Sequence, residues 1–227
     1  MRGLRLLIIG KQGSGKGTLC VQFAQHFGVP HISTGDAFRA AVAESSERGI
    51  RAKAFMESGQ LVPDDLVMEI VDELFVRESL RERGFLFDGF PRTVHQADLL
   101  DATLAPEGVD AVIDLEVSTE VVVARLASRR VCSNPNCGAI YSLKSPPKSP
   151  WNCDLCGSPV VQRDDDREEM IRRRLDDYEA MTAPLVDRYE ALGKLIRVDA
   201  ALSPDEVFSR ALAELLTRRL ANETGEA

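Results

Sequence analysis

Short apolar runs alternate with longer amphipathic stretches along most of this chain. The apolar runs predict buried strands at 4–9, 85–87, 111–115 and 195–198. Apolar residues spaced three and four apart predict helices at about 15–27, 36–42, 63–74, 119–130, 167–181, 184–192 and 204–220. Because strands alternate with helices, we expect an α/β fold, with a doubly wound parallel sheet covered by helices on both faces.

The pattern changes over residues 131–165. Cys, Pro, Gly, Asn and Ser replace the periodic apolar positions there, which predicts an irregular insertion rather than a long helix or a buried strand. The chain has 227 residues, of which 44% are hydrophobic. This is enough for one full-sized core with insertions.

The composition argues against two kinds of partner. A formal net charge of −8 disfavours nucleic acid and membrane surfaces, which bind basic faces, so an anion site must come from locally clustered Arg. No apolar run approaches the ~20 residues of a membrane span. The first ten residues are basic and then apolar like a signal peptide, but this run is short and has no cleavage site. We therefore expect a cytoplasmic protein, and we expect a monomer.

A glycine-rich stretch with a reachable lysine follows the first predicted strand. It reads G-K-Q-G-S-G-K-G-T from Gly10 to Thr18. Such glycines let several N–H groups point into one hollow, the next helix adds the positive end of its dipole, and Lys16 adds a full charge. The order is typical of a nucleotide-phosphate loop, although an ordinary glycine turn is the alternative. The expected phosphate-binding residues are Gly13, Ser14, Gly15, Lys16, Gly17 and Thr18.

The loop departs from the pattern G-x-x-x-x-G-K-[ST] in one position. Gly17 stands where Ser or Thr is expected, and Thr18 comes one residue later. This G-K-G-T form resembles nucleoside monophosphate kinases more than GTPases or motor ATPases.

Asp88 ends a predicted buried strand. In a parallel sheet the ligand site lies at the carboxyl ends of the strands, so Gly10 and Asp88 should meet there. A carboxylate in that place can hold the water shell of Mg²⁺ beside a phosphate loop. Considered alone, Asp88 is better explained as an N-cap for the next helix.

Three sequence motifs favour the Mg²⁺ role of Asp88 over the N-cap role. They are D-G-F-P-R-T from Asp88, S-T-G-D from Ser33 and G-Q-L-V-P-D from Gly59. With Arg163 and the acids at 165, 166, 168 and 169, they closely resemble the adenylate kinase family, in family order and over almost the whole chain. The resemblance implies the reaction MgATP + AMP ⇌ 2 ADP, with ATP, AMP and ADP as partners and Mg²⁺ as a cofactor.

The resemblance also implies roles for individual residues. Those that match AMP-binding positions are Thr34, Arg39, Gln60, Leu61, Val62, Gly89, Phe90, Pro91, Arg92, Gln96, Arg163 and Arg174. Those that match ATP-binding positions outside the loop are Arg125, against the adenine, Arg129 and Tyr141. The implied catalytic residues are Lys16, Asp88, Arg92, Arg129, Arg163 and Arg174.

Helix geometry gives a separate expectation for the arginines. Arg125 and Arg129 are four residues apart and should share one helix face, where a bound anion would relieve their repulsion. Arg172 and Arg173 have acids four residues away and should form solvated ion pairs. Arg174 lacks such acids and could face either a cleft or solvent.

Four cysteines fall in the irregular segment, at Cys132, Cys137, Cys153 and Cys156. Two close pairs separated by a loop predict a tetrahedral Zn²⁺ site, and four thiolates leave no open position, so the metal would be structural. Disulfides and iron are the alternatives. Some members of the adenylate kinase family carry such a metal in the lid over ATP, and this segment occupies that place. Nucleic-acid binding is disfavoured because only two residues between the first and last cysteine are basic.

The remaining Cys and His residues give no clear functional pattern. Cys20 lies within the first predicted helix and is interpreted as a small core residue. His26, His31 and His95 form no ligand spacing with one another.

These interpretations divide the chain into three parts. They are a P-loop core at 1–32, 63–128 and 166–227, an AMP-binding arm at 33–62 and a zinc-binding lid at 129–165. Closure of both arms would exclude water as a competing acceptor. The alternatives are a nucleoside monophosphate kinase for another base, and a non-catalytic nucleotide sensor or zinc-ribbon interaction module.

Overall fold

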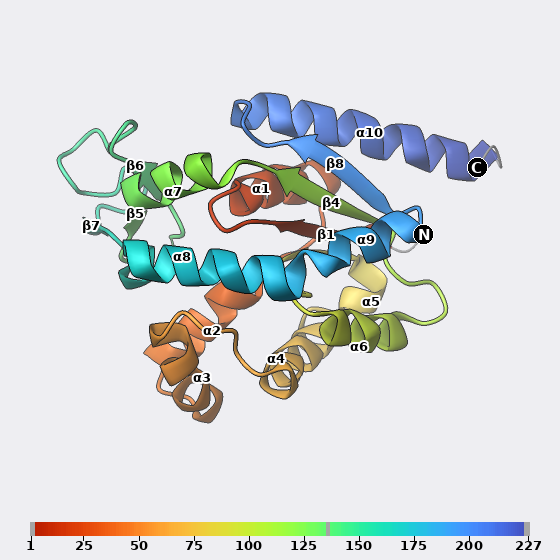
Figure 1. The fold of residues 1–227 in the computed structure, drawn as a ribbon, viewed down its shortest axis with the longest axis horizontal. Coiled ribbons are helices and arrows are strands. Elements are labelled where there is room, and N and C mark those ends of the chain that lie inside the picture. The colour runs from red at the N-terminus through yellow and green to blue at the C-terminus, as the bar shows by residue number, and fades with distance from the viewer. Residues whose placement is uncertain (1–2, 135–136, 225–227) are drawn as a thin grey trace.

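The computed structural model describes residues 3–134 and 137–224. Its centre is a sheet of five parallel strands in the order β2-β3-β1-β4-β8 (Figure 1). The prediction of an α/β fold with a parallel sheet is thereby confirmed. The strands are β1 (Arg5–Gly10), β2 (His31–Ser33), β3 (Phe85–Asp88), β4 (Ala111–Glu116) and β8 (Leu195–Asp199).

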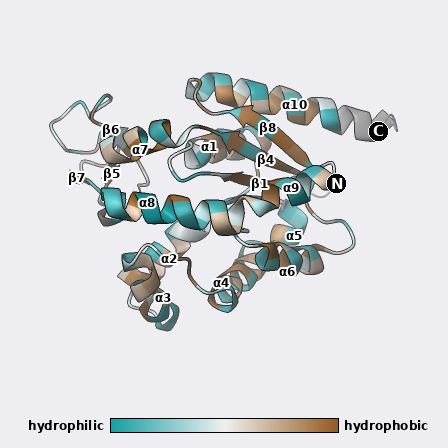
Figure 2. Cartoon of the chain, in the orientation of Figure 1, coloured by the Kyte–Doolittle hydropathy of each residue, from teal (hydrophilic) through white to brown (hydrophobic). Residues whose placement is uncertain are grey.

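Alternate side chains of the sheet enter two hydrophobic cores, because successive residues of a strand point to opposite faces. Leu7 and Ile9 of β1 pack into one core, and Leu6 and Ile8 into the other. Figure 2 shows these hydrophobic strands between layers of helices. The first core is covered by α2 (Thr34–Ala43), α4 (Asp64–Arg77), α5 (Leu80–Arg83), α6 (Val94–Leu104) and α9 (Pro184–Ala191), and the second by α1 (Lys16–Phe27) and α10 (Pro204–Thr224).

The other helices flank the carboxyl end of the sheet. They are α3 (Glu47–Glu57), which packs on α2, α7 (Thr119–Ser128) and α8 (Glu168–Asp177). A 3₁₀ turn, η1 (Asp164–Asp166), precedes α8, and a π-helical turn, η2 (Tyr178–Thr182), joins it to α9. Among the described residues, no helix combines the length and the apolar character needed to cross a membrane.

The segment predicted to be irregular forms a small sheet of its own. Strand β5 (Arg129–Cys132) pairs with β6 (Ile140–Ser142) and β7 (Val160–Val161), both antiparallel. These strands have two to four residues each, too few to show a periodic pattern. Cys132, Cys153 and Val160 form their own buried cluster. Pro135 and Asn136 of the predicted lid, and residues 1–2 and 225–227 of the predicted core, lie outside the described residues.

Two predicted helix boundaries were wrong. Helix α7 stops at Ser128 instead of residue 130, because Arg129 takes an extended conformation (φ −63°, ψ 139°) and begins β5. The predicted break between two helices at 181–184 is bridged by η2, a turn that sequence periodicity does not reveal.

Candidate active site

A cleft of about 1240 Å³ opens at the carboxyl ends of β1 and β3. The glycine-rich loop and Asp88 both line it, as the parallel topology requires. Of the residues expected to contact either nucleotide, all but one line this cleft. The exception is Phe90, which is fully buried and packs against Phe87 with ring centroids 5.3 Å apart. Phe90 can therefore offer a ligand only its backbone.

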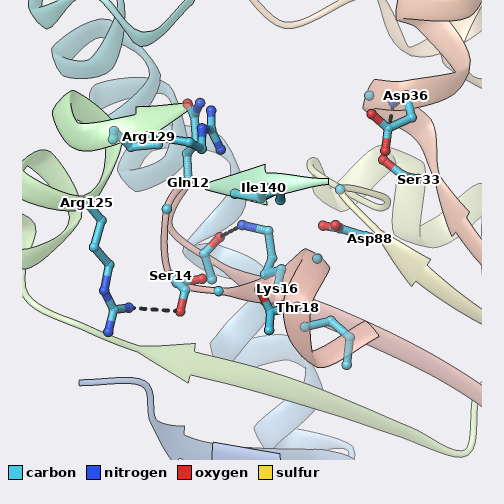
Figure 3. Close-up of a pocket in the computed structure, with 18 of the residues that line it drawn as sticks. Gln12, Ser14, Lys16, Thr18, Ser33, Asp36, Asp88, Arg125, Arg129 and Ile140 are labelled. Carbon is cyan, nitrogen blue, oxygen red and sulfur yellow. Dashed lines mark hydrogen bonds between the residues drawn. The ribbon is translucent and has the colours of Figure 1, made fainter. Parts of the chain in front are cut away.

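The loop after β1 is shaped by glycines in left-handed conformations. Gly13 has a φ of +81°, and a Cβ there would lie 2.8 Å from Leu126 Cγ. Gly15 has a φ of +106° and caps α1. Within the described residues, the buried atoms Ser14 Oγ and Gln12 Oε1 have no hydrogen-bond partner. Figure 3 shows both residues beside Lys16 at the cavity. Unpartnered polar atoms around a helix N-terminus fit a phosphate ligand.

Lys16 lies at the centre of this loop. Its Nζ donates hydrogen bonds to the carbonyl oxygens of Gly10 and Lys11, each at 2.8 Å. The pKa of Lys16 is lowered to about 8, chiefly by burial, with the charge of Asp88 opposing this shift and those of Arg92 and Arg174 adding to it. The charge that Lys16 would offer a phosphate is therefore lost a little above neutral pH.

Two adjacent acids of η1 hold two of the four implied catalytic arginines, which match the phosphate-clamping positions of the family. Arg129 donates to both carboxylate oxygens of Asp166, at 2.8 and 2.6 Å. Arg174 donates to Asp165 at 2.5 Å. Bidentate pairing fixes the plane of a guanidinium as well as its position. Arg174 thus lines the cleft and does not face solvent, which settles the alternative left open by helix spacing.

The other two clamping arginines are held in an unfavourable electrostatic setting. Burial lowers the pKa of Arg92, and the charge of Arg39 lowers it further. Burial likewise lowers the pKa of Arg163 to about 10, with Arg39 and Arg129 adding to the effect. In a chain whose formal net charge is −8, this local positive excess fits a polyanionic ligand.

Arg125 and Arg129 do not share a face, which corrects the expectation from helix spacing. Arg125 donates to the carbonyl oxygens of Ser14, at 3.3 Å, and Ala200, at 2.8 Å. Arg129 lies beyond the end of α7 and turns to Asp166. The loop after β8 also lines the cleft, through residues that include Ala200, Leu202 and Pro204. These small apolar residues carried no functional signal in the sequence.

On the other side of the cleft, Thr34 and Arg92 converge on one carbonyl. Thr34 Oγ1 donates to the Gly89 oxygen at 2.9 Å, and Arg92 Nε donates to the same atom at 2.8 Å. Ser33 Oγ accepts a hydrogen bond from the backbone N–H of Asp36 and thereby caps the N-terminus of α2. This cap anchors the start of α2 beside Asp88.

Gln96 is buried and already committed to neighbouring groups. Its Oε1 accepts from the backbone N–H of Arg92, and its Nε2 donates to Asp64 Oδ1, both at 2.7 Å. The second carboxylate oxygen of Asp64 accepts from Thr93 at 2.9 Å. One N–H and one acceptor lone pair of Gln96 remain for a ligand. The sequence places Asp64 at the start of a helix and at the end of the G-Q-L-V-P-D motif, but it does not place Asp64 beside Gln96.

The four cysteines of the small sheet come together as the metal prediction requires. All their Sγ atoms lie within 4.8 Å of one another, and none forms a disulfide. The Sγ atoms of Cys132 and Cys156 are 3.4 Å apart, and those of Cys137 and Cys153 are 3.5 Å apart. With Zn–S bonds of about 2.3 Å, tetrahedral geometry spaces sulfurs by roughly 3.8 Å. The donor set therefore fits Zn²⁺.

Tyr141 links this cluster to the cleft. Its hydroxyl donates to Cys153 Sγ at 3.4 Å and accepts from the backbone N–H of Asp154 at 2.7 Å, while the residue also lines the cleft. The resemblance suggested a contact with ATP; the structure adds a hydrogen bond that orients a cluster thiol.

The site combines a glycine-rich loop at the end of β1, an acidic residue at the end of the neighbouring strand β3, and a set of arginines that line the cleft. This combination defines a P-loop phosphotransferase of the nucleoside monophosphate kinase class. A model of the family named adenylate kinase matches residues 8–194. The chain belongs to the adenylate kinase family.

Individual relatives match over nearly their full lengths. An adenylate kinase of Carboxydothermus hydrogenoformans is 46% identical over 209 residues, covering 91% of this chain and 96% of the relative. An adenylate kinase of Syntrophotalea carbinolica is 44% identical, covering 93% and 98%, and one of Streptomyces avermitilis is 42% identical, covering 93% and 97%.

Proposed function

We propose that this enzyme catalyses MgATP + AMP ⇌ 2 ADP. The observation that carries the proposal is the arrangement of charge in one cleft: Lys16 and its loop lie on one side, and four arginines gather from the other elements. Phosphoryl transfer needs little acid–base chemistry from the protein, but it needs in-line alignment and charge cover for a loose transition state. Two phosphate subsites in one cavity supply both.

The ATP phosphates are assigned to the loop from Gly13 to Thr18, and the adenine to the side of Arg125. AMP is assigned to the wall formed by Thr34, Arg39 and Gln96, where Gln96 can donate to and accept from the adenine edge. Arg92, Arg129, Arg163 and Arg174 cover the phosphates between them. All of these residues line the cleft, which supports the assignment.

Mg²⁺, when bound with ATP, supplies charge neutralisation for the β- and γ-phosphate oxygens. Asp88 is the residue proposed to hold its water shell. Asp88 lies at the carboxyl end of β3, with its side chain 17% exposed, and Figure 3 shows it directed into the cavity near Lys16. A half-buried carboxylate beside a phosphate loop fits that task.

Residues 129–165 are proposed to form a lid. One structural Zn²⁺, coordinated by Cys132, Cys137, Cys153 and Cys156, would hold this lid together. Four thiolates leave no open position, so this metal takes no part in the chemistry. Residues 33–62 are proposed to form the AMP arm, and the remainder the core. Closure of the arm and the lid would exclude water, the competing phosphoryl acceptor. The cytoplasmic compartment and the monomeric state stay predictions from the sequence.

An acceptor panel tests the reaction. The purified protein is assayed for ADP formation from ATP and Mg²⁺ with AMP, GMP, CMP or UMP. We expect turnover with AMP and a requirement for Mg²⁺. A better rate with another monophosphate would overturn the assignment of AMP.

Lys16→Met tests the role of the loop. We expect it to abolish most turnover with an unchanged circular dichroism spectrum. Lys11→Met is the matched control, because the Lys11 side chain pairs with Glu179 at 3.0 Å and should leave turnover intact. Near-normal activity of a folded Lys16→Met protein would contradict the catalytic role of the loop.

A further inference from the structure

Cys20, His31 and Asp88 form a second cluster of potential metal ligands, behind the phosphate loop. One ligand atom from each residue lies within 4.8 Å of the other two. Cys20 comes from α1, His31 begins β2 and Asp88 ends β3. Sequence spacing gave no reason to group them, because only the parallel sheet places β2 and β3 side by side under α1.

The imidazole of His31 is free to act as a ligand. Its Nε2 is buried and has no hydrogen-bond partner in the described part of the chain. The distance from this nitrogen to Asp88 Oδ2 is 3.9 Å, which is beyond hydrogen-bond range. Burial lowers the pKa of His31, against the opposing charges of Asp88 and Asp36. The ring is therefore neutral near pH 7, and Nε2 can offer its lone pair.

The Sγ atom of Cys20, on α1, is the third potential ligand atom of the cluster. The residue is fully buried and forms no disulfide. Gly17 lies one helical turn earlier on the same side of α1, where a Cβ would stand 3.5 Å from Asp88 Oδ2. Because Gly17 has no side chain, this space between α1 and the Asp88 carboxylate is left open.

We propose that Cys20, His31 and Asp88 bind a thiophilic divalent cation such as Zn²⁺, and that this binding inhibits the enzyme. Sulfur and imidazole donors select Zn²⁺ over Mg²⁺, which prefers oxygen ligands. The inhibitory part rests on the proposed function, since the cation occupies the carboxylate assigned to the water shell of Mg²⁺. The positive charges of Lys16 and Arg92, both close to Asp88, make this site weaker than the lid cluster.

Coordination at this site releases one proton. The Cys20 thiol gives its proton to solvent, and the sulfur lone pair forms the bond to the cation. His31 binds through the lone pair of Nε2, and Asp88 binds through a carboxylate oxygen.

Metal counting tests the site. Protein holding one zinc in the lid is equilibrated with zinc buffers of rising free concentration and analysed for bound metal. We expect two zinc ions per chain in the unaltered protein, and one in Cys20→Ala and in His31→Gln. His26→Gln is the matched control, because His26 is an exposed histidine on the same helix as Cys20 and should still allow two.

A cobalt spectrum gives a second measurement that needs no activity. Co²⁺ added to the zinc-loaded protein should produce a thiolate-to-cobalt charge-transfer band in the unaltered chain, and Cys20→Ala should lack it. If Cys20→Ala does not fold, His31→Gln provides the comparison. A limit of one metal per chain, or a band that persists in Cys20→Ala, would overturn the site.

The kinase assay separates this inference from the proposed function. At a zinc concentration that fills the second site, the unaltered enzyme should lose most of its rate, while Cys20→Ala keeps its own. Equal zinc sensitivity in both proteins would overturn the inhibitory role. A protein that shows no kinase activity even before the second zinc is added, but then binds that zinc, would leave the site standing and contradict the proposed function instead.

Discussion

Asp64 illustrates how a single residue can govern a nucleotide site through another. It holds Gln96 by a hydrogen bond of 2.7 Å and Thr93 by one of 2.9 Å. If Asp64→Asn turns an N–H toward Gln96, the amide must rotate or lose its partner. A buried hydrogen bond of this kind is worth about 1–3 kcal/mol. We expect the AMP KM to rise by roughly five- to 100-fold, together with a loss of preference for AMP over GMP.

The control for this prediction is the next residue. Asp65 is exposed, and Asp65→Asn should change neither value. Steady-state kinetics with AMP and GMP as acceptors measure both. If Asp64→Asn lowers kcat alone and keeps the preference for AMP, the positioning role is wrong.

The depressed pKa of Lys16 predicts a pH dependence of ATP binding. Burial lowers the pKa of Lys16 to about 8, and a bound phosphate would raise it again. Free protein therefore takes up a proton on binding ATP at pH values above about 8. We expect affinity for ATP to be level below that value and to fall by up to tenfold per pH unit above it. Titration calorimetry between pH 7 and 9.5 measures this fall.

The same shift has a consequence for stability without nucleotide. Between about pH 8 and the unfolded value of 10.5, the unfolded chain holds a proton on Lys16 that the folded chain has lost. The contribution of Lys16 to the free energy of unfolding therefore rises with pH through that window. Lys16→Met should remove both this rise and the fall in ATP affinity.

At the level of single residues, the sequence could identify which side chains carry the binding and catalytic groups. It could not identify which distant residues those side chains contact. The loop, Asp88 and the arginines were found because their residue types are tied to local motifs, and the structure gathers them in one cleft. Asp64, His31 and the loop at Ala200 were not found. Their roles depend on which distant segments fold beside them, and motif spacing carries no information on that.

At the level of elements, long periodic segments were predictable and short ones were not. The buried strands and the predicted helices match their apolar patterns to within a few residues, but α3 and α6, of 11 residues each, were not predicted. The three-residue strand β2 and the small strands β5, β6 and β7 have too few residues to show alternation. They form because neighbouring strands supply their hydrogen bonds, which is a tertiary effect.

The small sheet predicts a metal-dependent element. Its buried cluster is built largely from the cysteines themselves, so metal binding must supply much of its folding free energy. Removing zinc by chelation, or replacing Cys153 with Ser, should lower the melting temperature by about 2–4 °C for each kcal/mol lost. Activity should recover partly at low temperature, where the element can still order.

Calorimetry and activity measured between 10 and 40 °C check this expectation. Cys20→Ala is the control for the loss of a thiol elsewhere: because it leaves the four-cysteine cluster, chelation should lower its melting temperature by the same amount as in the unaltered chain. A chelated protein with an unchanged melting temperature would contradict the structural role, and a protein purified without chelators that holds no metal would contradict the site.

At the level of the whole molecule, ion pairs join the predicted AMP arm to the core. Arg51 of α3 donates to both carboxylate oxygens of Glu69 on α4, each at 3.0 Å, and Arg48 pairs with Glu73 one turn further along. All four side chains are about 40% exposed, so each pair contributes at most ~1 kcal/mol. This free energy is small compared with the free energy of folding. It is large compared with the free-energy difference between two positions of the arm.

We expect Arg48→Gln combined with Arg51→Gln to raise the AMP KM about two- to fivefold. The melting temperature should shift by only a few degrees, and amide exchange in α3 should accelerate. Lys53→Gln is the control, because Lys53 pairs with Glu57 within α3 at 3.7 Å. A similar change in the AMP KM for Lys53→Gln would show a general charge effect instead of a link between arm and core.

The pairing of β5 with β7 has a consequence for how this molecule can vary. Val131 lies opposite Val161, so the chain leaves the core and returns to it at neighbouring points. The stretch between them is a closed loop whose ends need not move when its contents change, and the entropic cost of closing it varies only slowly with its length. A short turn, or a segment held together by other side chains, could replace residues 133–158 without disturbing the register of the five parallel strands. The segment proposed to cover the nucleotide is therefore also the one that can be exchanged with the least effect on the rest of the fold.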